Sequence, residues 1–272
     1  LAMSFTPPVP AVVFLSLYRA QPIDLSQLPH VYAALDLLAR RAGLPATPQL
    51  HYLPSRVLNA FATGSRDAAA IAVTDGMLRS LGFRELVGVL AHEVSHIANG
   101  DLWIMPMADT MSRVTTILSY CGLFLLAVNP PLIALGAVSV PWLLVLLLVF
   151  APSLMSLLQL ALSRTREFDA DLEAARLSGD PEGLAAALAK LERRQPMTWE
   201  RLLFPGQRIP DPSLLRTHPP TEERVRRLLE LRESGTKLAP LPQIAVRPAI
   251  ALPAGWIPIT RRPRLRWPGL WY

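Results

Sequence analysis

The sequence predicts a mainly helical α+β fold with a small antiparallel sheet and an inserted transmembrane helical hairpin. Three observations support this prediction. Apolar residues recur every three or four positions in several segments, which is typical of amphipathic helices. Short runs with strand-like composition lie between turn-forming residues in the first third of the chain. No Asp, Glu, Lys or Arg occurs between Arg113 and Arg164.

The first expected elements are a helix and the sheet. Residues 30–41 carry an amphipathic pattern, and the Gly-Leu-Pro sequence at residues 43–45 ends it. Three β-like runs follow, at residues 49–53, 57–63 and 70–74, and turn-formers separate them. Short strands in close succession favour antiparallel pairing.

Residues 92–96 read His-Glu-Val-Ser-His inside a segment whose apolar residues form one helical stripe. Positions four apart share a helix face, so His92 and His96 can offer two imidazole nitrogens to one metal ion. Glu93 lies beside the first ligand and can act as a base. The alternative to a metal site is a helix with two surface histidines whose spacing has no functional meaning. Two His ligands and an adjacent carboxylate are the minimal set for zinc-assisted peptide hydrolysis.

The uncharged run is long enough for two membrane spans of about 20 residues each. We expect the first at residues 114–128, the second within residues 132–162, and the turn at the Asn-Pro-Pro sequence of residues 129–131. A buried hairpin of a soluble protein is the alternative. The run at residues 143–150 has no polar face, which favours membrane insertion.

Charge and cysteine content set further limits. Arg113, Arg164 and Arg166 flank the hairpin, so the positive-inside rule predicts that both of its ends face the cytoplasm. The net charge of +6 fits a membrane surface better than nucleic acid, because residues 261–267 mix Arg with Trp. A solvated tail is the alternative. Cys121 is the single cysteine, so no intrachain disulfide can form.

A catalytic zinc ion keeps three protein ligands and one open position, so a third ligand must come from another segment. Glu167, just after the second expected span, is the best candidate. Asp171 lies one helical turn further on and faces the same way, which suits an acceptor that orients a ligand imidazole. The alternative is a solvated, charged first turn of a helix.

Four segments together resemble the HtpX-type membrane zinc metalloproteases, which are gluzincins related to the CAAX prenyl proteases. Members of this type usually carry two further spans ahead of the catalytic domain, where this sequence has a short apolar run at residues 9–17. The matching segments occur in the family's order: Asn59-Ala60-Phe61-Ala62-Thr63-Gly64, residues 89–101, residues 163–171, and Thr217-His218-Pro219-Pro220-Thr221-Glu222-Glu223-Arg224.

The resemblance implies a mainly helical gluzincin domain and a role for each matching polar residue. His92, His96 and Glu167 would be the ligands of one Zn²⁺ per chain. Glu93 would be the general base and then the general acid. Asp171 would accept a hydrogen bond from a ligand imidazole and so orient it.

The resemblance also implies how a polypeptide substrate is held. Asn59, Ala60, Phe61 and Ala62 would form an edge strand that pairs with an extended substrate. His218 would stabilise the oxyanion of the tetrahedral intermediate, although a capping or core histidine before a Pro-Pro turn is the alternative reading of that residue.

The expected function is that of a membrane-anchored zinc endopeptidase in membrane protein quality control, with misfolded or membrane proteins as substrates. It would be integral to a bacterial-type inner membrane, with its site facing the cytoplasm. One rival is a CAAX-type processing protease, which two spans argue against. Another is a non-catalytic membrane scaffold or metal-binding regulator, which the presence of Glu93 argues against.

The expected organisation has four parts. Residues 1–110 hold the sheet and the motif helix, and residues 111–162 form the hairpin. Residues 163–236 return to the catalytic domain with the third ligand and two helices, which begin at Asp180-Pro181 and at Thr221. Residues 237–272, rich in Pro and Arg, form an irregular tail.

Overall fold

The computed structural model describes residues 15, 19–134, 142–194, 220–233, 265–266 and 270–271. Its helices are α2 (Pro29–Arg41), α3 (Asp75–Ser80), α4 (Phe83–Asn99), α5 (Asp101–Ala134), α6 (Trp142–Ser178), α7 (Pro181–Arg194) and α9 (Thr221–Glu233). Its strands are β1 (Gln21–Pro22), β2 (Gln49–Leu53), β3 (Ala60–Gly64), β4 (Ala69–Thr74), β5 (Leu265–Arg266) and β6 (Leu270–Trp271).

The chain forms two compact units. The first contains Leu1–Leu102 and Glu167–Tyr272, and the second contains Trp103–Arg166. The boundary between the two units therefore falls within helices α5 and α6. The first residues of α5 and the last third of α6 belong to the first unit. A mainly helical fold with a small sheet and two long apolar helices confirms the fold class predicted from the sequence.

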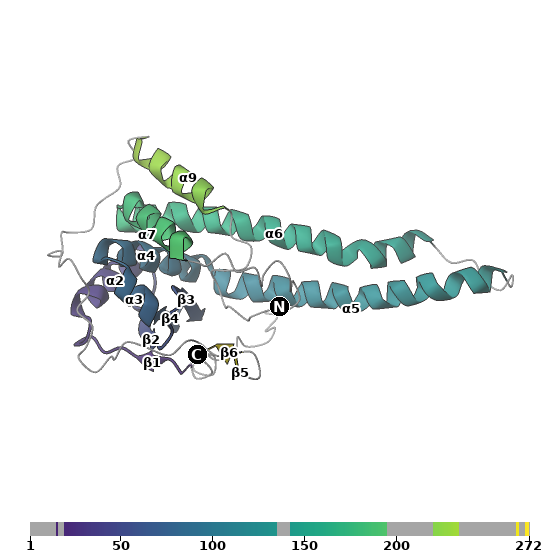
Figure 1. Cartoon of the computed structure of the whole chain (residues 1–272), viewed down its shortest axis with the longest axis horizontal. Helices are drawn as coiled ribbons and strands as arrows, with labels where there is room; N and C mark the ends of the chain where they lie inside the picture. Colours follow the sequence, from purple (N-terminus) through teal and green to yellow (C-terminus); the bar gives the residue numbers. More distant parts are fainter. Residues whose placement is uncertain are drawn as a thin grey trace. The chain divides into compact units, whose positions relative to one another are not determined.

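The sheet of the first unit is mixed, and here the expectation of purely antiparallel pairing is wrong. Its strand order is β1-β2-β4-β3 (Figure 1). β1 and β2 are antiparallel, as are β3 and β4, but β2 and β4 are parallel. After β2 the chain passes over one strand position to form β3. β4 then returns from the β3 hairpin in the direction of β2 and fills the gap, which leaves β3 at the edge.

The edge strand begins later than expected, at Ala60 instead of residue 57. Asn59 precedes it and is tied to Thr74 by three hydrogen bonds: its N–H donates to Thr74 Oγ1, and its carbonyl accepts from both the Oγ1 hydroxyl and the amide of Thr74. Thr74 also accepts a hydrogen bond from the Met77 amide and so caps α3. The start of β3 is thereby held in place against β4.

Helix α4 is the central helix of the first unit and carries the His-Glu motif. Its predicted apolar stripe is buried, and every side chain from Leu86 to Ser95 is buried as well, because α2, α7 and the sheet all pack around it. Each large side chain buried in this way contributes about 1.5–3 kcal/mol. Gly88 allows the close approach of α7, since a Cβ there would lie 2.7 Å from the Leu184 amide nitrogen.

The ends of α4 are also set by local sequence. Glu85 accepts a hydrogen bond of 2.6 Å from the Gly82 amide at the first turn. Gly100 ends the helix in the left-handed conformation, with φ of 73°, as the Asn-Gly pair predicts. Asp180 likewise caps α7 by accepting a hydrogen bond from the Gly183 amide, so the predicted start of that helix is confirmed.

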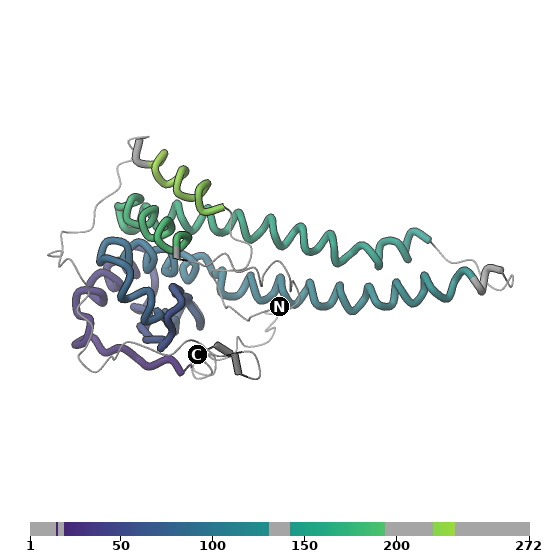
Figure 2. The backbone as a smooth tube through the Cα atoms, viewed as in Figure 1, coloured from purple at the N-terminus to yellow at the C-terminus, as the bar shows by residue number. Residues whose placement is uncertain are grey.

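In the second unit, α5 and α6 run side by side (Figure 2). Both helices are long and apolar enough to cross a membrane, and little of either is buried. Gly122 lets the helices approach, since a Cβ there would lie 2.7 Å from Leu148 Cβ. Ser112 Oγ donates a 2.7 Å hydrogen bond to Gln159 across the pair. Exposed side chains such as Leu143 argue against a hairpin buried inside a soluble protein.

Two details of the hairpin differ from expectation. Helix α5 does not turn at residues 129–131 but continues through both prolines to Ala134. Residues 135–141, between the two helices, lie outside the described residues. The segment with Glu167 does not begin a new helix. It continues α6 without a break, because residues 163–178 contain no helix breaker.

Two expectations about the chain ends fall largely outside the described part. Of the apolar run at residues 9–17, the structure describes only Leu15, which is buried beside the sheet. Of the expected irregular tail at residues 237–272, it describes the short antiparallel pair of β5 and β6.

Candidate metal centre and active site

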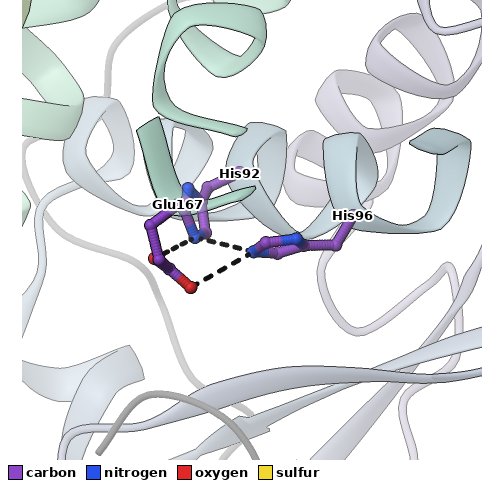
Figure 3. Close-up of side chains that lie close together, drawn as sticks. All are labelled: His92, His96 and Glu167. Carbon is purple, nitrogen blue, oxygen red and sulfur yellow. Dashed lines mark hydrogen bonds and ion pairs between the residues drawn. The ribbon is translucent and has the colours of Figure 1, made fainter. Parts of the chain in front are cut away.

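His92 and His96 lie one turn apart on α4, and their rings converge with the carboxylate of Glu167 from α6 (Figure 3). The two Nε2 atoms are 3.1 Å apart. Glu167 Oε2 lies 3.5 Å from His92 Nε2, and Oε1 lies 3.8 Å from His96 Nε2. The three donors could hold one metal ion, since they all lie within 4.8 Å of one another.

The donor set can be tested against tetrahedral geometry. Metal–ligand bonds of about 2.0–2.2 Å at tetrahedral angles place donor atoms about 3.3–3.6 Å apart, close to the spacings of this cluster. Two imidazoles and one carboxylate are also a ligand set of catalytic zinc sites. His92 and Glu167 are buried, while His96 is partly exposed. The residues therefore fit a zinc ion.

Each histidine has a carboxylate behind its Nδ1 atom. Asp101 Oδ2 lies 2.8 Å from Nδ1 of His96, and Asp171 Oδ1 lies 3.1 Å from Nδ1 of His92. A carboxylate at Nδ1 favours the tautomer that carries its proton there, which leaves Nε2 free to bind a metal. Both imidazoles are therefore oriented with Nε2 toward the shared site.

Sequence reasoning singled out Asp171 but missed Asp101. Asp101 follows Gly100 at the end of α4, and the left-handed glycine turns the chain so that the buried carboxylate reaches back to His96. A signal was available: an acid directly after a helix-ending glycine, five residues beyond a ligand histidine.

The environment also tunes the charge of the site. Burial lowers the pKa of His92, which favours the neutral, metal-binding form. For His96, burial acts in the same direction, but the hydrogen bond with Asp101 and the nearby carboxylates of Glu93 and Glu167 outweigh it and raise the pKa. The two pKa shifts thus have opposite directions, although the Nε2 atoms of both rings point toward the same site.

Glu93 is buried next to the first histidine, and burial raises the pKa of its carboxyl to about 7. The Ala62 amide donates a hydrogen bond to it, which partly opposes this rise. A carboxylate that titrates near neutral pH is matched to general base and acid work at physiological pH.

Arg224 is a second residue that sequence reasoning did not assign. It lies near the start of α9 with a fully buried side chain, and it donates two hydrogen bonds of 2.6 Å to the two oxygens of Asp171. Its Nη1 lies 3.2 Å from Glu167 Oε2. An arginine in a charged first helical turn carries no sequence signal of burial, so only the fold reveals this contact.

The residues expected to hold substrate lie at the sheet edge nearest α4. Ala60 and Ala62 belong to β3, which packs against α4, while the side chain of Phe61 is buried on the opposite face of the sheet. Because the Thr74 amide donates to the Asn59 carbonyl, alternation places the amide of Ala62 on the side of β3 that faces away from β4. That amide is the one that reaches Glu93. His218 lies outside the described residues.

Comparison with known proteins places this geometry in a family. Residues 26–232 match Peptidase family M48. The chain is 41% identical over 259 residues to the "Protease HtpX homolog" of Acaryochloris marina, covering 88% of this chain and 81% of that protein. It is 38% identical over 242 residues to the homolog of Thermococcus kodakarensis, covering 81% and 80%.

A solved structure shares the fold. The crystal structure of S. mikatae Ste24p superposes with a TM-score of 0.51 at 20% sequence identity, covering 79% of this chain and 52% of that one. This chain thus spans about half the length of that protein.

The fold and the cluster on α4 and α6 define a membrane protease with a site able to hold a metal ion. The chain belongs to Peptidase family M48. The resemblance drawn from the four sequence segments is thereby confirmed.

Proposed function

We propose that the protein is a membrane-anchored zinc-dependent endopeptidase. The observation that carries this proposal is the convergence of two histidine Nε2 atoms and the Glu167 carboxylate beside the buried Glu93. A site that only stored or sensed a metal would have no use for a buried carboxylate with a pKa of about 7 next to its ligands. His92, His96 and Glu167 would hold one zinc ion per chain.

The chemistry divides between the ion and the chain. A bound zinc ion would supply Lewis acidity, which lowers the pKa of a water molecule to about 7 and polarises a carbonyl group. Glu93 accepts the proton of the attacking water and then delivers it to the leaving amine. General acid–base catalysis of this kind contributes about 10²–10⁴ in rate. Asp101 and Asp171 keep both imidazoles aligned throughout.

Substrate recognition would use the outer edge of β3, on the side away from β4. The segment at residues 59–62 would pair with an extended peptide, which would add to the sheet as a further strand beside β3. Main-chain hydrogen bonds are largely independent of side chains, so the edge would accept many sequences provided that they are extended. This favours unfolded segments, and we propose misfolded or damaged membrane proteins as the substrate class. His218 would stabilise the developing oxyanion.

Location follows from the two apolar helices and the arginines next to them. Arg113 precedes the spanning part of α5, and Arg164 and Arg166 follow that of α6. The positive-inside rule supports a site on the cytoplasmic side, and we propose a bacterial-type inner membrane as the location. Because α6 is continuous from its span to Glu167, one helix would carry both the anchor and a metal ligand.

Cleavage of an unfolded reporter protein tests the proposal. Purified protein in detergent should cleave the reporter, lose activity with a zinc chelator, and regain it when zinc is restored. Glu167→Ala should be inactive, whereas Asp169→Asn, which alters an exposed carboxylate two residues away on α6, should be as active as the unaltered chain. Zinc binding without cleavage of unfolded or membrane substrates would instead favour a metal-binding regulator.

A further inference from the structure

Arg224 occupies an unusual position for its charge. Among the residues that the structure describes, it is the one Lys or Arg whose side chain is buried. The metal cluster and its immediate surroundings contain four buried carboxylates: Glu93, Asp101, Glu167 and Asp171. A buried carboxylate is costly unless a positive charge or hydrogen bonds compensate it. Arg224 supplies a permanent positive charge at this place.

The contacts of Arg224 are divided between two residues of the site. Nε and Nη2 hold the two oxygens of Asp171, and Nη1 faces Glu167 Oε2. Asp171 in turn lies behind His92, so one guanidinium reaches the partner of one proposed ligand and the carboxylate of another. A lysine could not reproduce this arrangement, because its ammonium is a single point charge without the planar fork.

Arg224 also belongs to a helix that packs both on α7 and on the α6 segment near the metal cluster. Helix α9 packs on α7, buries Leu228, and lays Arg227 over the ring of Phe168 at 3.7 Å. Phe168 is the residue after Glu167, so α9 contacts the α6 segment that carries the third ligand at two points. Docking of α9 and the position of Glu167 therefore depend on each other.

We propose that Arg224 is a positioning residue that couples the docking of α9 to metal affinity, by holding Glu167 and Asp171 where they can serve the metal. The inference rests on the metal site of the proposed function. If α9 docking raises metal affinity, then bound metal must stabilise α9 docking by the same factor. The coupling can therefore be tested through zinc affinity and, separately, through the docking of α9.

The first test measures zinc affinity by competition with a chelator of known affinity. Arg224→Gln should weaken zinc binding by about 10–100-fold, the usual cost of losing a partner of a ligand. Arg224→Lys should recover part of that loss. Arg226→Gln is the matched control, because Arg226 lies two residues away on α9 and is exposed. Zinc affinity within about threefold of the unaltered chain in a folded Arg224→Gln protein would overturn the proposal.

The second test needs no variant. Hydrogen exchange of α9 in the unaltered chain should slow when zinc is added and quicken when zinc is removed, with α2 as an internal reference. Equal exchange of α9 with and without zinc would overturn the coupling, even if Arg224 variants fail to fold. In Arg224→Gln, the dependence on zinc should largely vanish.

The outcomes separate this inference from the proposed function. If the unaltered chain binds no zinc, the metal site itself is wrong. If it binds zinc and cleaves substrate but Arg224 variants bind zinc equally well, only the positioning role fails. Loss of kcat with unchanged zinc affinity would make Arg224 a group that contacts substrate, and would likewise overturn the positioning role.

Discussion

Glu93→Gln should abolish turnover and, in the metal-free protein, increase stability. Glutamine has nearly the same shape and can still accept the hydrogen bond from the Ala62 amide. It cannot take a proton from water, so cleavage should fall by about 10²–10⁴, the contribution of a general base. Glutamine is also uncharged, so it avoids the cost of burying a carboxylate. The resulting gain in stability can be calculated from the structure.

The stability effect follows from the pKa of Glu93. Burial raises that pKa from 4.5 to about 7. A carboxyl whose pKa is higher in the folded state than in the unfolded state stabilises the fold fully at low pH, and this contribution is lost as pH rises through about 4.5 to 7. A rise of this size corresponds to about 3 kcal/mol. Above pH 7 the unaltered chain therefore contains a buried, ionised carboxylate that lowers its free energy of unfolding by this amount, whereas Glu93→Gln does not.

Thermal unfolding of chelator-treated protein between pH 4.5 and pH 8 provides the assay. The difference in free energy of unfolding between Glu93→Gln and the unaltered chain should grow with pH to about 3 kcal/mol, or roughly 6–12 °C in Tm. Asp169→Asn, at an exposed carboxylate, should show no such trend. A difference that stays flat across this range would refute the argument that burial perturbs Glu93.

Three further predictions concern other parts of the chain. Asp101→Asn should weaken zinc binding about 10–100-fold, because it removes the carboxylate that orients His96, and chelator competition measures this loss. Replacing Leu146 and Leu147 with Lys should prevent membrane insertion, at about 2.5–3.5 kcal/mol per charge, and normal carbonate-resistant association would contradict a span there. His218→Ala should lower kcat by about 10²–10³ with unchanged zinc content and little change in KM, whereas loss of zinc would make His218 a ligand or its support.

Much of the fold was predictable because its signals are local. The helical stripe, the Asn-Gly stop and the spacing of His92 and His96 depend on residues within a few turns of one another. The uncharged run between Arg113 and Arg164 similarly predicts two long apolar helices, and both are present. Glu167 comes from a distant segment: its place after the second expected span made it a candidate, and resemblance to a known family implied its role as a ligand.

The missed features depend on contacts between distant segments. The parallel pairing of β2 with β4 arises because β3 takes the edge position, and short strands carry no signal of which neighbours they choose. Arg224 stands in a segment whose charged residues read as a solvated helix start, yet the packing of α9 buries it. Asp101 is the exception, since its place after Gly100 could have been interpreted from sequence.

The most direct test of the account is the zinc content of the purified protein. Elemental analysis should find one zinc per chain in the unaltered protein, in Glu93→Gln and in Asp169→Asn, and much less in His92→Ala, His96→Ala and Glu167→Ala. Full occupancy in Glu167→Ala would contradict the three-residue metal site on which the proposed chemistry depends.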